Sequence, residues 1–123
     1  MTRARTYEAA ERHGRQAERL AALLLRLKGY RILARHWKSP MGELDIVAAR
    51  GRTVAFVEVK ARAAAAEAAE SLGARQRRRI GRAASLFIAA HPALAGHDLR
   101  FDLMLVLPWR LPVHIPNAWH EDA

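Results

Sequence analysis

The sequence contains no cysteine among its 123 residues. This absence excludes a disulfide framework and any metal site built from thiolates. The sequence also lacks long apolar runs, since no segment approaches the roughly 18 consecutive apolar residues of a membrane-spanning helix. Near the start of the chain, Glu8, Glu11 and Glu18 interrupt anything that resembles a signal-peptide core. We therefore expect a soluble, cytoplasmic protein with no membrane association.

Acidic residues are also scarce. The 12 Asp and Glu are outnumbered by 21 Lys and Arg, which gives a formal net charge of +9. Such an excess indicates a polyanionic partner, either nucleic acid or an acidic membrane surface. Most of the charge is Arg, whose fork suits phosphate, and nothing basic and amphipathic at the termini favours a membrane. The expected partner is nucleic acid, and the length and hydrophobic fraction of 51% indicate one folded domain, residues 1–123.

A first amphipathic helix is predicted over residues 7–28, ending at Gly29. Its apolar stripe is expected to consist of Ala17, Leu20, Ala21, Leu23, Leu24 and Leu27. Arg19 and Arg26 fall on the opposite, solvated side. Glu18 lies at the margin of the stripe, so it either reaches a site on the sheet beneath or pairs with an arginine.

A second amphipathic helix is predicted over residues 73–91, ending before Pro92. Its buried face is expected to consist of Ile80, Ala83, Phe87 and Ala90. Gln76 lies on the same line, so it points into a polar pocket or is exposed to water at the helix end. The helix also carries a stripe of four arginines, namely Arg75, Arg78, Arg79 and Arg82. Because acids are absent from this helix, we expect phosphate contacts rather than a merely solvated face.

Strands are predicted over residues 30–37, 42–48, 54–60 and 99–107, with an edge strand in the C-terminal segment. Residues 49–52 contain a glycine and read as the turn of a hairpin. Residues 61–70 are alanine-rich and are expected to extend a helix or to form a mobile flap. Strands and helices alternate without regular spacing, so the fold class is α/β with a mixed sheet of four to five strands flanked by helices.

The hairpin brings charged residues together in an apolar setting. Strict alternation puts Glu43 and Asp45 on one face, opposite Leu44 and Ile46, and puts Glu58 and Lys60 on one face of the next strand. Unpaired charges there would be costly to bury, and a divalent cation could offset that cost.

Carboxylate oxygens suit Mg²⁺, so Asp45 and Glu58 are the expected metal ligands. Lys60 could polarise the attacking water or neutralise the transition state. Asp102, the lone acid of the last long strand, could join the site, although pairing with Arg100 or with nearby backbone is the safer interpretation.

Two motifs, Gly42–Ala48 and Val57–Arg62, resemble those of the PD-(D/E)XK nuclease superfamily and, more closely, of the YraN-like family of small bacterial predicted endonucleases related to Holliday-junction resolvases. Residues 14–18, 28–33, 100–102 and 114–119 fit further signatures of that family. The resemblance implies a restriction-endonuclease-like fold. It also implies an endonuclease dependent on Mg²⁺ (or Mn²⁺) that acts on branched or structured DNA, a role that would favour a homodimer.

The resemblance also implies roles for single residues. Asp45, Glu58 and Lys60 would form the nuclease triplet, Glu18 would be the helix-borne acid at the metal, and Glu43 and Gln76 would be auxiliary. Arg62, at the end of the second motif, joins the arginines expected to bind nucleic acid. The alternative is a non-catalytic nucleic-acid-binding protein that retains the nuclease fold.

Overall fold

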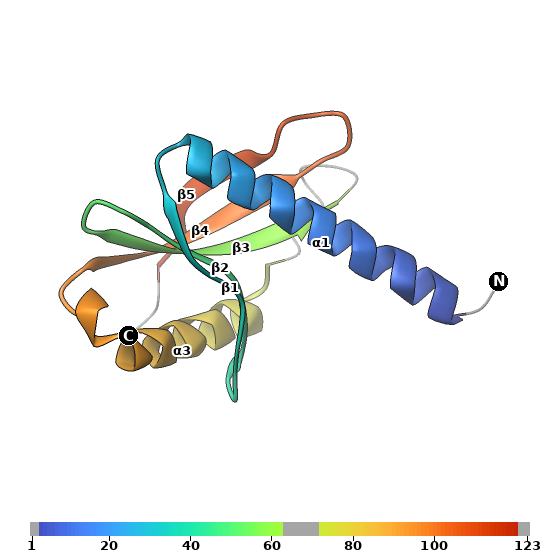
Figure 1. Ribbon diagram of the computed structural model, residues 1–123. Helices are drawn as coiled ribbons and strands as arrows, with labels where there is room; N and C mark the ends of the chain where they lie inside the picture. Colours follow the sequence, from blue (N-terminus) through green and yellow to red (C-terminus); the bar gives the residue numbers. More distant parts are fainter. Residues whose placement is uncertain (1–2, 63–71, 121–123) are drawn as a thin grey trace.

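Five strands form a single mixed sheet in the described part of the chain, in the order β1-β2-β3-β4-β5 (Figure 1). The computed structural model describes residues 3–62 and 72–120. The elements are α1 (Arg3–Leu27), β1 (Arg31–Ser39), β2 (Gly42–Arg50), β3 (Thr53–Ala61), α3 (Ala74–Ala90), the 3₁₀ turn η1 (Pro92–Leu94), β4 (Asp98–Val106) and β5 (Val113–Trp119). The predicted α/β class with a mixed sheet flanked by helices is confirmed.

The connections explain why the sheet is mixed. Short turns join β1 to β2 and β2 to β3, so both pairs are antiparallel. The crossover from β3 to β4 contains α3, and these two strands are parallel, with Ala61 beside Val106 at their ends. β5 returns antiparallel to β4 at the edge of the sheet, as predicted for the C-terminal segment.

The two helices cover opposite faces of the sheet (Figure 1). Beneath α3, the alternate residues Phe56, Phe101 and Leu103 pack against Phe87. Beneath α1, Ile46, Val57 and Met104 pack against small side chains of the helix. β3 and β4 are therefore buried on both faces, as expected for a strand that is nearly continuous in apolar residues.

The predicted apolar stripe of α1 is partly wrong. Leu20, Leu23 and Leu27 are 48%, 52% and 76% exposed. The face against the sheet consists of Ala17, Glu18, Ala21, Ala22 and Leu25. The alanine side chains let the helix backbone lie close to the sheet. The helical period of the apolar residues could not by itself distinguish this alanine-rich face from the leucine-rich face beside it. Arg19 and Arg26 are exposed, as predicted.

The second helix follows the prediction more closely. Ile80, Ala83 and Phe87 are buried, together with Gly81 and Ala84. Ala90 is exposed, contrary to expectation, because it is the last residue of α3 and lies beyond the edge of the core.

The predicted helix extension or flap over residues 61–70 lies largely outside the described residues; Ala61 itself ends β3. Among the described helices, neither combines the length and the apolar character needed to span a bilayer.

Candidate metal and phosphate site

The site begins where β2 and β3 separate. Their regular pairing runs only as far as Ile46 opposite Val57. One residue earlier, the Asp45 carboxylate accepts a hydrogen bond of 2.9 Å from the backbone N–H of Val59. The side chain therefore lies in the fork between the two strands rather than on one regular face.

The predicted alternation in β2 is wrong at this point for the same reason. Leu44 belongs to the core under α3, whereas Ile46 belongs to the core under α1, so the two do not share a face. The opposite strand is irregular here too, because His36 adopts a positive φ of 51° between the pairs Arg35–Ile46 and Trp37–Leu44.

Glu58 lies on β3 next to Asp45, and side chains from α3 and β3 hold it. Gln76 Nε2 donates a hydrogen bond of 2.7 Å to Glu58 Oε1. The Lys60 ammonium lies 3.4 Å from the same oxygen and donates a hydrogen bond of 3.3 Å to Gln76 Oε1. Of the two interpretations of Gln76, the structure agrees with the one that points it into the polar pocket.

Glu18 approaches from α1, on the other face of the sheet. It is only 7% exposed, and its Oε1 makes no hydrogen bond within the described residues. His36 Nε2 lies 3.0 Å from that oxygen as an ion-pair contact, but without hydrogen-bond geometry. Of the two alternatives for Glu18, reaching a site on the sheet or pairing with an arginine, the structure agrees with the first.

Together these side chains line one cavity of about 400 Å³, here called the acidic pocket. Its walls are Gly14, Ala17, Glu18, Asp45, Glu58, Val59, Lys60, Ala61 and Arg62. The pocket thus contains three carboxylates, one ammonium and the predicted phosphate-binding Arg62. Helix α1 and strands β2 and β3, which meet here, are each needed to complete it.

Burial without enough donors raises the pKa of all three carboxyl groups. Desolvation and the neighbouring Asp45 charge raise the pKa of Glu58 to about 8, against a partial lowering by Lys60. The pKa of Glu18 rises to about 7, again through desolvation first and Asp45 second. Desolvation also raises the pKa of Asp45, although the Val59 N–H opposes the shift. The pocket therefore holds less positive charge than its acids require.

This donor set fits a divalent cation. Glu18 Oε1 is a buried oxygen without a hydrogen bond, and the acids nearby repel one another. Within residues 3–62 and 72–120, no three His, Asp, Glu or Cys side chains are grouped tightly enough to hold a metal by themselves. Mg²⁺ does not need three, because one or two carboxylates suffice when water and substrate phosphate complete its shell.

Glu43 lies outside the acidic pocket. Its Oε1 is 2.8 Å from His36 Nδ1, and both residues line an adjacent hollow of about 460 Å³ together with Gly14, Arg15, Glu18 and Lys38. His36 therefore connects Glu43 to Glu18. His36 could not be identified as a site residue from the sequence, because nothing in the alternation of its strand indicates the positive φ that it adopts.

The predicted phosphate-binding arginines Arg75, Arg78, Arg79 and Arg82 are all exposed on α3. Arg79 lies against the β1–β2 turn, where a Cβ on Gly42 would be only 2.7 Å from Arg79 Cδ. The stripe thus extends from the helix towards the start of β2, three residues before Asp45.

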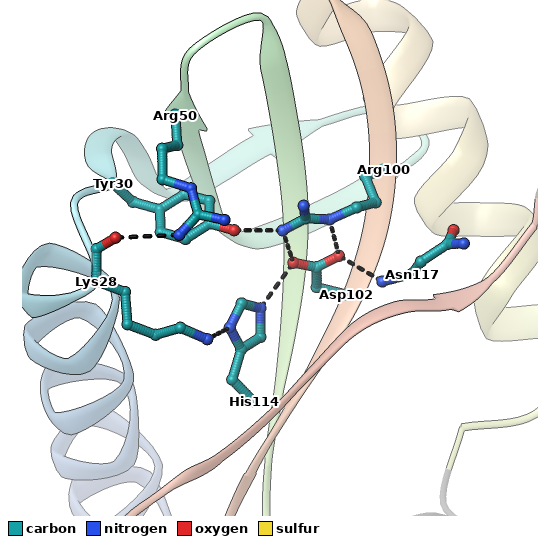
Figure 2. A network of polar contacts seen from close by, with 7 residues as sticks. All are labelled: Lys28, Tyr30, Arg50, Arg100, Asp102, His114 and Asn117. Carbon is teal, nitrogen blue, oxygen red and sulfur yellow. Dashed lines mark hydrogen bonds and ion pairs between the residues drawn. The ribbon is translucent and has the colours of Figure 1, made fainter.

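A further buried carboxylate, Asp102, belongs to a separate cluster that we call the Asp102 network (Figure 2). Arg100 donates two hydrogen bonds to it, of 2.8 and 2.7 Å, and also donates to the hydroxyl of Tyr30. His114 Nε2 and the backbone N–H of Asn117 donate at 2.7 and 2.9 Å. Asp102 therefore pairs with Arg100, as the safer interpretation predicted, and does not join the acidic pocket.

Lys28 completes the Asp102 network, since its ammonium donates to His114 Nδ1 and thereby leaves the imidazole proton on Nε2, facing Asp102 (Figure 2). Burial alone would raise the pKa of Asp102, but the donors outweigh it and lower the pKa to about 2. This network fastens the end of α1, β4 and β5 to one another.

Comparison with known proteins gives a consistent result. Residues 17–106 match the model of "Uncharacterised protein family UPF0102". A UPF0102 protein of Paramagnetospirillum magneticum is 57% identical over 122 residues, covering 96% of this chain and 95% of that relative. UPF0102 proteins of Parvibaculum lavamentivorans and Methylorubrum extorquens are 54% and 53% identical, each over 90% of this chain and over 84% and 88% of their own lengths.

Proposed function

The chain belongs to the UPF0102 family, and from that premise and the acidic pocket we propose that it is a metal-dependent nuclease that hydrolyses phosphodiester bonds in branched or otherwise structured DNA. The observation that supports this most strongly is the meeting of Glu18, Asp45 and Glu58 beside Lys60 in one cavity. A purely structural cluster would be expected to match its acids with donors, as the Asp102 network does.

Asp45 and Glu58 would hold Mg²⁺ or Mn²⁺, and Glu18 would add a third negative charge beside the cation from α1. When bound, the cation supplies charge stabilisation at the phosphate and a water of lowered pKa. The raised pKa values support this role, because acids that repel one another when empty gain most from a shared cation.

Lys60 would act on the phosphate or on the water that attacks it. Its side chain is only 13% exposed, and its ammonium is held by Glu58 and by Gln76, so its position is fixed before substrate arrives. A preorganised positive charge in a partly dry cavity stabilises developing negative charge more than a mobile one on the surface. Gln76 is therefore a positioning residue for both Glu58 and Lys60.

Nucleic acid is the substrate class that the charge favours. The net charge is +9, Arg62 lines the acidic pocket, and the α3 arginines are exposed beside the start of β2. Each phosphate contact releases counterions, so binding should weaken steeply with salt. A two-fold dimer would suit a junction with two equivalent strands.

The test is cleavage of junction, flap and linear DNA with Mg²⁺ or Mn²⁺ by the wild type and by Asp45→Asn and Glu58→Gln. We expect each substitution to lower the cleavage rate by about a hundredfold or more. Asp98→Asn is the matched control, because Asp98 is exposed at the start of β4 and lies outside the pocket.

Two outcomes would overturn the proposal. Cleavage that persists unchanged in both variants would place the chemistry elsewhere. Salt-dependent DNA binding by the wild type without any cleavage would favour the non-catalytic alternative.

A further inference from the structure

The connection between β4 and β5 has an unusual composition. It reads Pro108-Trp109-Arg110-Leu111-Pro112, so a proline lies on each side of an aromatic residue, a cation and an apolar residue. Trp109 is fully exposed, at 102% of its reference surface, and Leu111 is 81% exposed. The other two tryptophans of the chain, Trp37 and Trp119, pack against the aromatic rings of the core.

The backbone presents Trp109 in a defined way. Its φ is +61°, a conformation that is uncommon for a bulky residue and that calls for a reason. Proline fixes its own φ, so the two flanking prolines restrict how the loop can relax. The chain thus holds a large aromatic side chain in water, and Arg110 follows it in the sequence.

The loop also lies at the functional end of the sheet. β3 and β4 are parallel, with Ala61 beside Val106, and the N–H of Arg62 donates to the Val106 carbonyl at 3.2 Å. The loop therefore leaves β4 next to the residues that end the acidic pocket. Figure 1 shows it as the orange-red connection that projects from β4 and β5.

The reach of the loop can be bounded from strand geometry. Ala61 is three residue steps along the chain from Glu58, and Trp109 is three residue steps from Val106. One strand spacing separates Ala61 from Val106. At about 3.4 Å per residue and about 5 Å between strands, Trp109 lies within roughly 25 Å of Glu58. That distance corresponds to at most about seven base steps along a nucleic-acid strand.

We propose that Trp109 is a stacking platform for an unpaired base, with Arg110 on the adjacent phosphate, so that the protein selects DNA that is frayed, forked or single-stranded near the acidic pocket. This rests on the proposed function for its substrate. Stacking on aromatic rings is tolerant of sequence and requires an accessible base face, which a duplex hides everywhere except at the outer faces of its two terminal pairs. An exposed aromatic residue beside an arginine supplies both parts of that recognition.

The test measures binding without cleavage, in buffer that contains a chelator. A labelled forked duplex and a blunt duplex of the same length and sequence are titrated by fluorescence anisotropy. We expect Trp109→Ala to weaken binding of the fork by about tenfold and Trp109→Phe to weaken it less. Binding of the blunt duplex should be unchanged by either substitution.

Leu111→Ala is the matched control, since Leu111 is an exposed apolar residue of the same loop but offers no ring. It should leave both affinities within about twofold, because exposed aliphatic side chains contribute little to stacking. The wild type should also show tryptophan fluorescence quenched by the fork, and Trp109→Phe should lose that quenching.

The inference is overturned if Trp109→Ala changes fork and blunt duplex equally, changes neither, or is matched by Leu111→Ala. It is also overturned if Trp109→Ala instead converts an oligomer to a monomer in sedimentation, because the side chain would then contact another copy. Because no turnover is needed, this result is independent of the cleavage test. Failure of the Asp45 and Glu58 variants to affect cleavage would remove the proposed nuclease activity and leave the stacking result readable.

Discussion

The acidic pocket and the Asp102 network both bury carboxylates, yet they do so in opposite ways. Asp102 receives hydrogen bonds from Arg100, His114 and the backbone of Asn117, and its pKa falls to about 2. Glu58 receives one from Gln76 and an ion pair from Lys60 while facing another acid, and its pKa rises to about 8. The fold supplies the first carboxylate with enough donors, whereas it leaves the second with fewer donors than its charge requires.

The difference indicates how to separate structure from function in a small domain. A buried acid with matched donors fixes the packing of the elements that supply them. A buried acid with too few donors destabilises the protein when no ligand is bound. Such an acid is expected mainly at functional sites, because a bound ligand offsets the lost stability there. Four predictions test whether the two clusters really differ in this way.

The largest effect is expected from removing Asp102. Asp102→Ala leaves the guanidinium of Arg100 half-buried without its partner, and we expect a loss of about 3 to 5 kcal/mol in the free energy of unfolding. Urea denaturation measures it. Asp45→Ala should behave differently, because relief of the repulsion among the pocket acids offsets loss of the hydrogen bond from the Val59 N–H, and stability should change by about 1 kcal/mol or less. Equal losses in the two variants would mean that the clusters are alike.

The two clusters should also impose opposite pH dependences on stability. The folded-state pKa of Asp102 is lowered, so its contribution is present above about pH 4 and is lost as the pH falls towards 2, a change on the order of 2 kcal/mol. The folded-state pKa of Glu58 is raised from 4.5 to about 8, so its contribution is present below pH 4.5 and is lost as the pH rises towards 8.

The free energy of unfolding, measured from pH 2 to 9 without metal, should therefore be greatest at about pH 4 to 5 and should decrease at lower and at higher pH. Glu58→Gln should make the alkaline decline shallower, with Glu18 keeping part of it, and should leave the acid side intact. An alkaline decline that is equally steep in Glu58→Gln would contradict the assignment of that side to the acidic pocket.

Most of the fold could be predicted from the sequence, because its signals are local. The β2–β3 turn contains Gly51, α3 ends before Pro92, and β4 alternates Phe101, Leu103 and Leu105 against Met104. The YraN-like family, which is UPF0102, could be predicted as well, from the motifs at 42–48 and 57–62, and the match over residues 17–106 confirms it. Membership of the PD-(D/E)XK nuclease superfamily stays a prediction. Which face of α1 packs on the sheet could not be predicted, because alanine and leucine rows of equal period compete for that role.

The site could be predicted only in part, for a physical reason. Asp45, Glu58 and Lys60 lie close in sequence on two strands of one hairpin, so strand geometry was enough to predict that they meet. His36 and the fork at Asp45 depend on a local break in the pairing of β1, β2 and β3, and alternation rules assume that no such break occurs. Glu43 was expected in the same pocket but contacts His36 in the neighbouring hollow.

A divalent cation should stabilise the protein through the acidic pocket alone. At ten times its dissociation constant, a ligand that binds only the folded state adds about 1.4 kcal/mol. We therefore expect Mg²⁺ or Mn²⁺ to raise the melting temperature of the wild type and of Tyr30→Phe, and not that of Asp45→Asn. Calcium-free and chelator-treated samples provide the baseline for differential scanning fluorimetry. An equal rise in Asp45→Asn would locate the bound cation outside the acidic pocket.

The smallest effect on stability per interaction removed, and the sharpest separation of roles, is expected from two substitutions that delete hydrogen bonds. Tyr30→Phe removes one bond, which Arg100 donates in the Asp102 network, and Gln76→Met removes two in the acidic pocket, one donated to Glu58 and one accepted from Lys60. Because these bonds are partly buried, each substitution should cost about 1 kcal/mol or less of unfolding free energy for each bond deleted.

Their effects on cleavage should not be equal, even if their stabilities are. Gln76 holds both Glu58 and the Lys60 ammonium, so Gln76→Met should lower the rate of DNA cleavage severalfold and should do so mainly in kcat, because the residue orients groups rather than binding substrate. Tyr30→Phe touches no residue of the acidic pocket and should leave the rate unchanged. If both variants lose activity in proportion to their lost stability, Gln76 supports only the fold, and the contrast between the two clusters does not extend to chemistry.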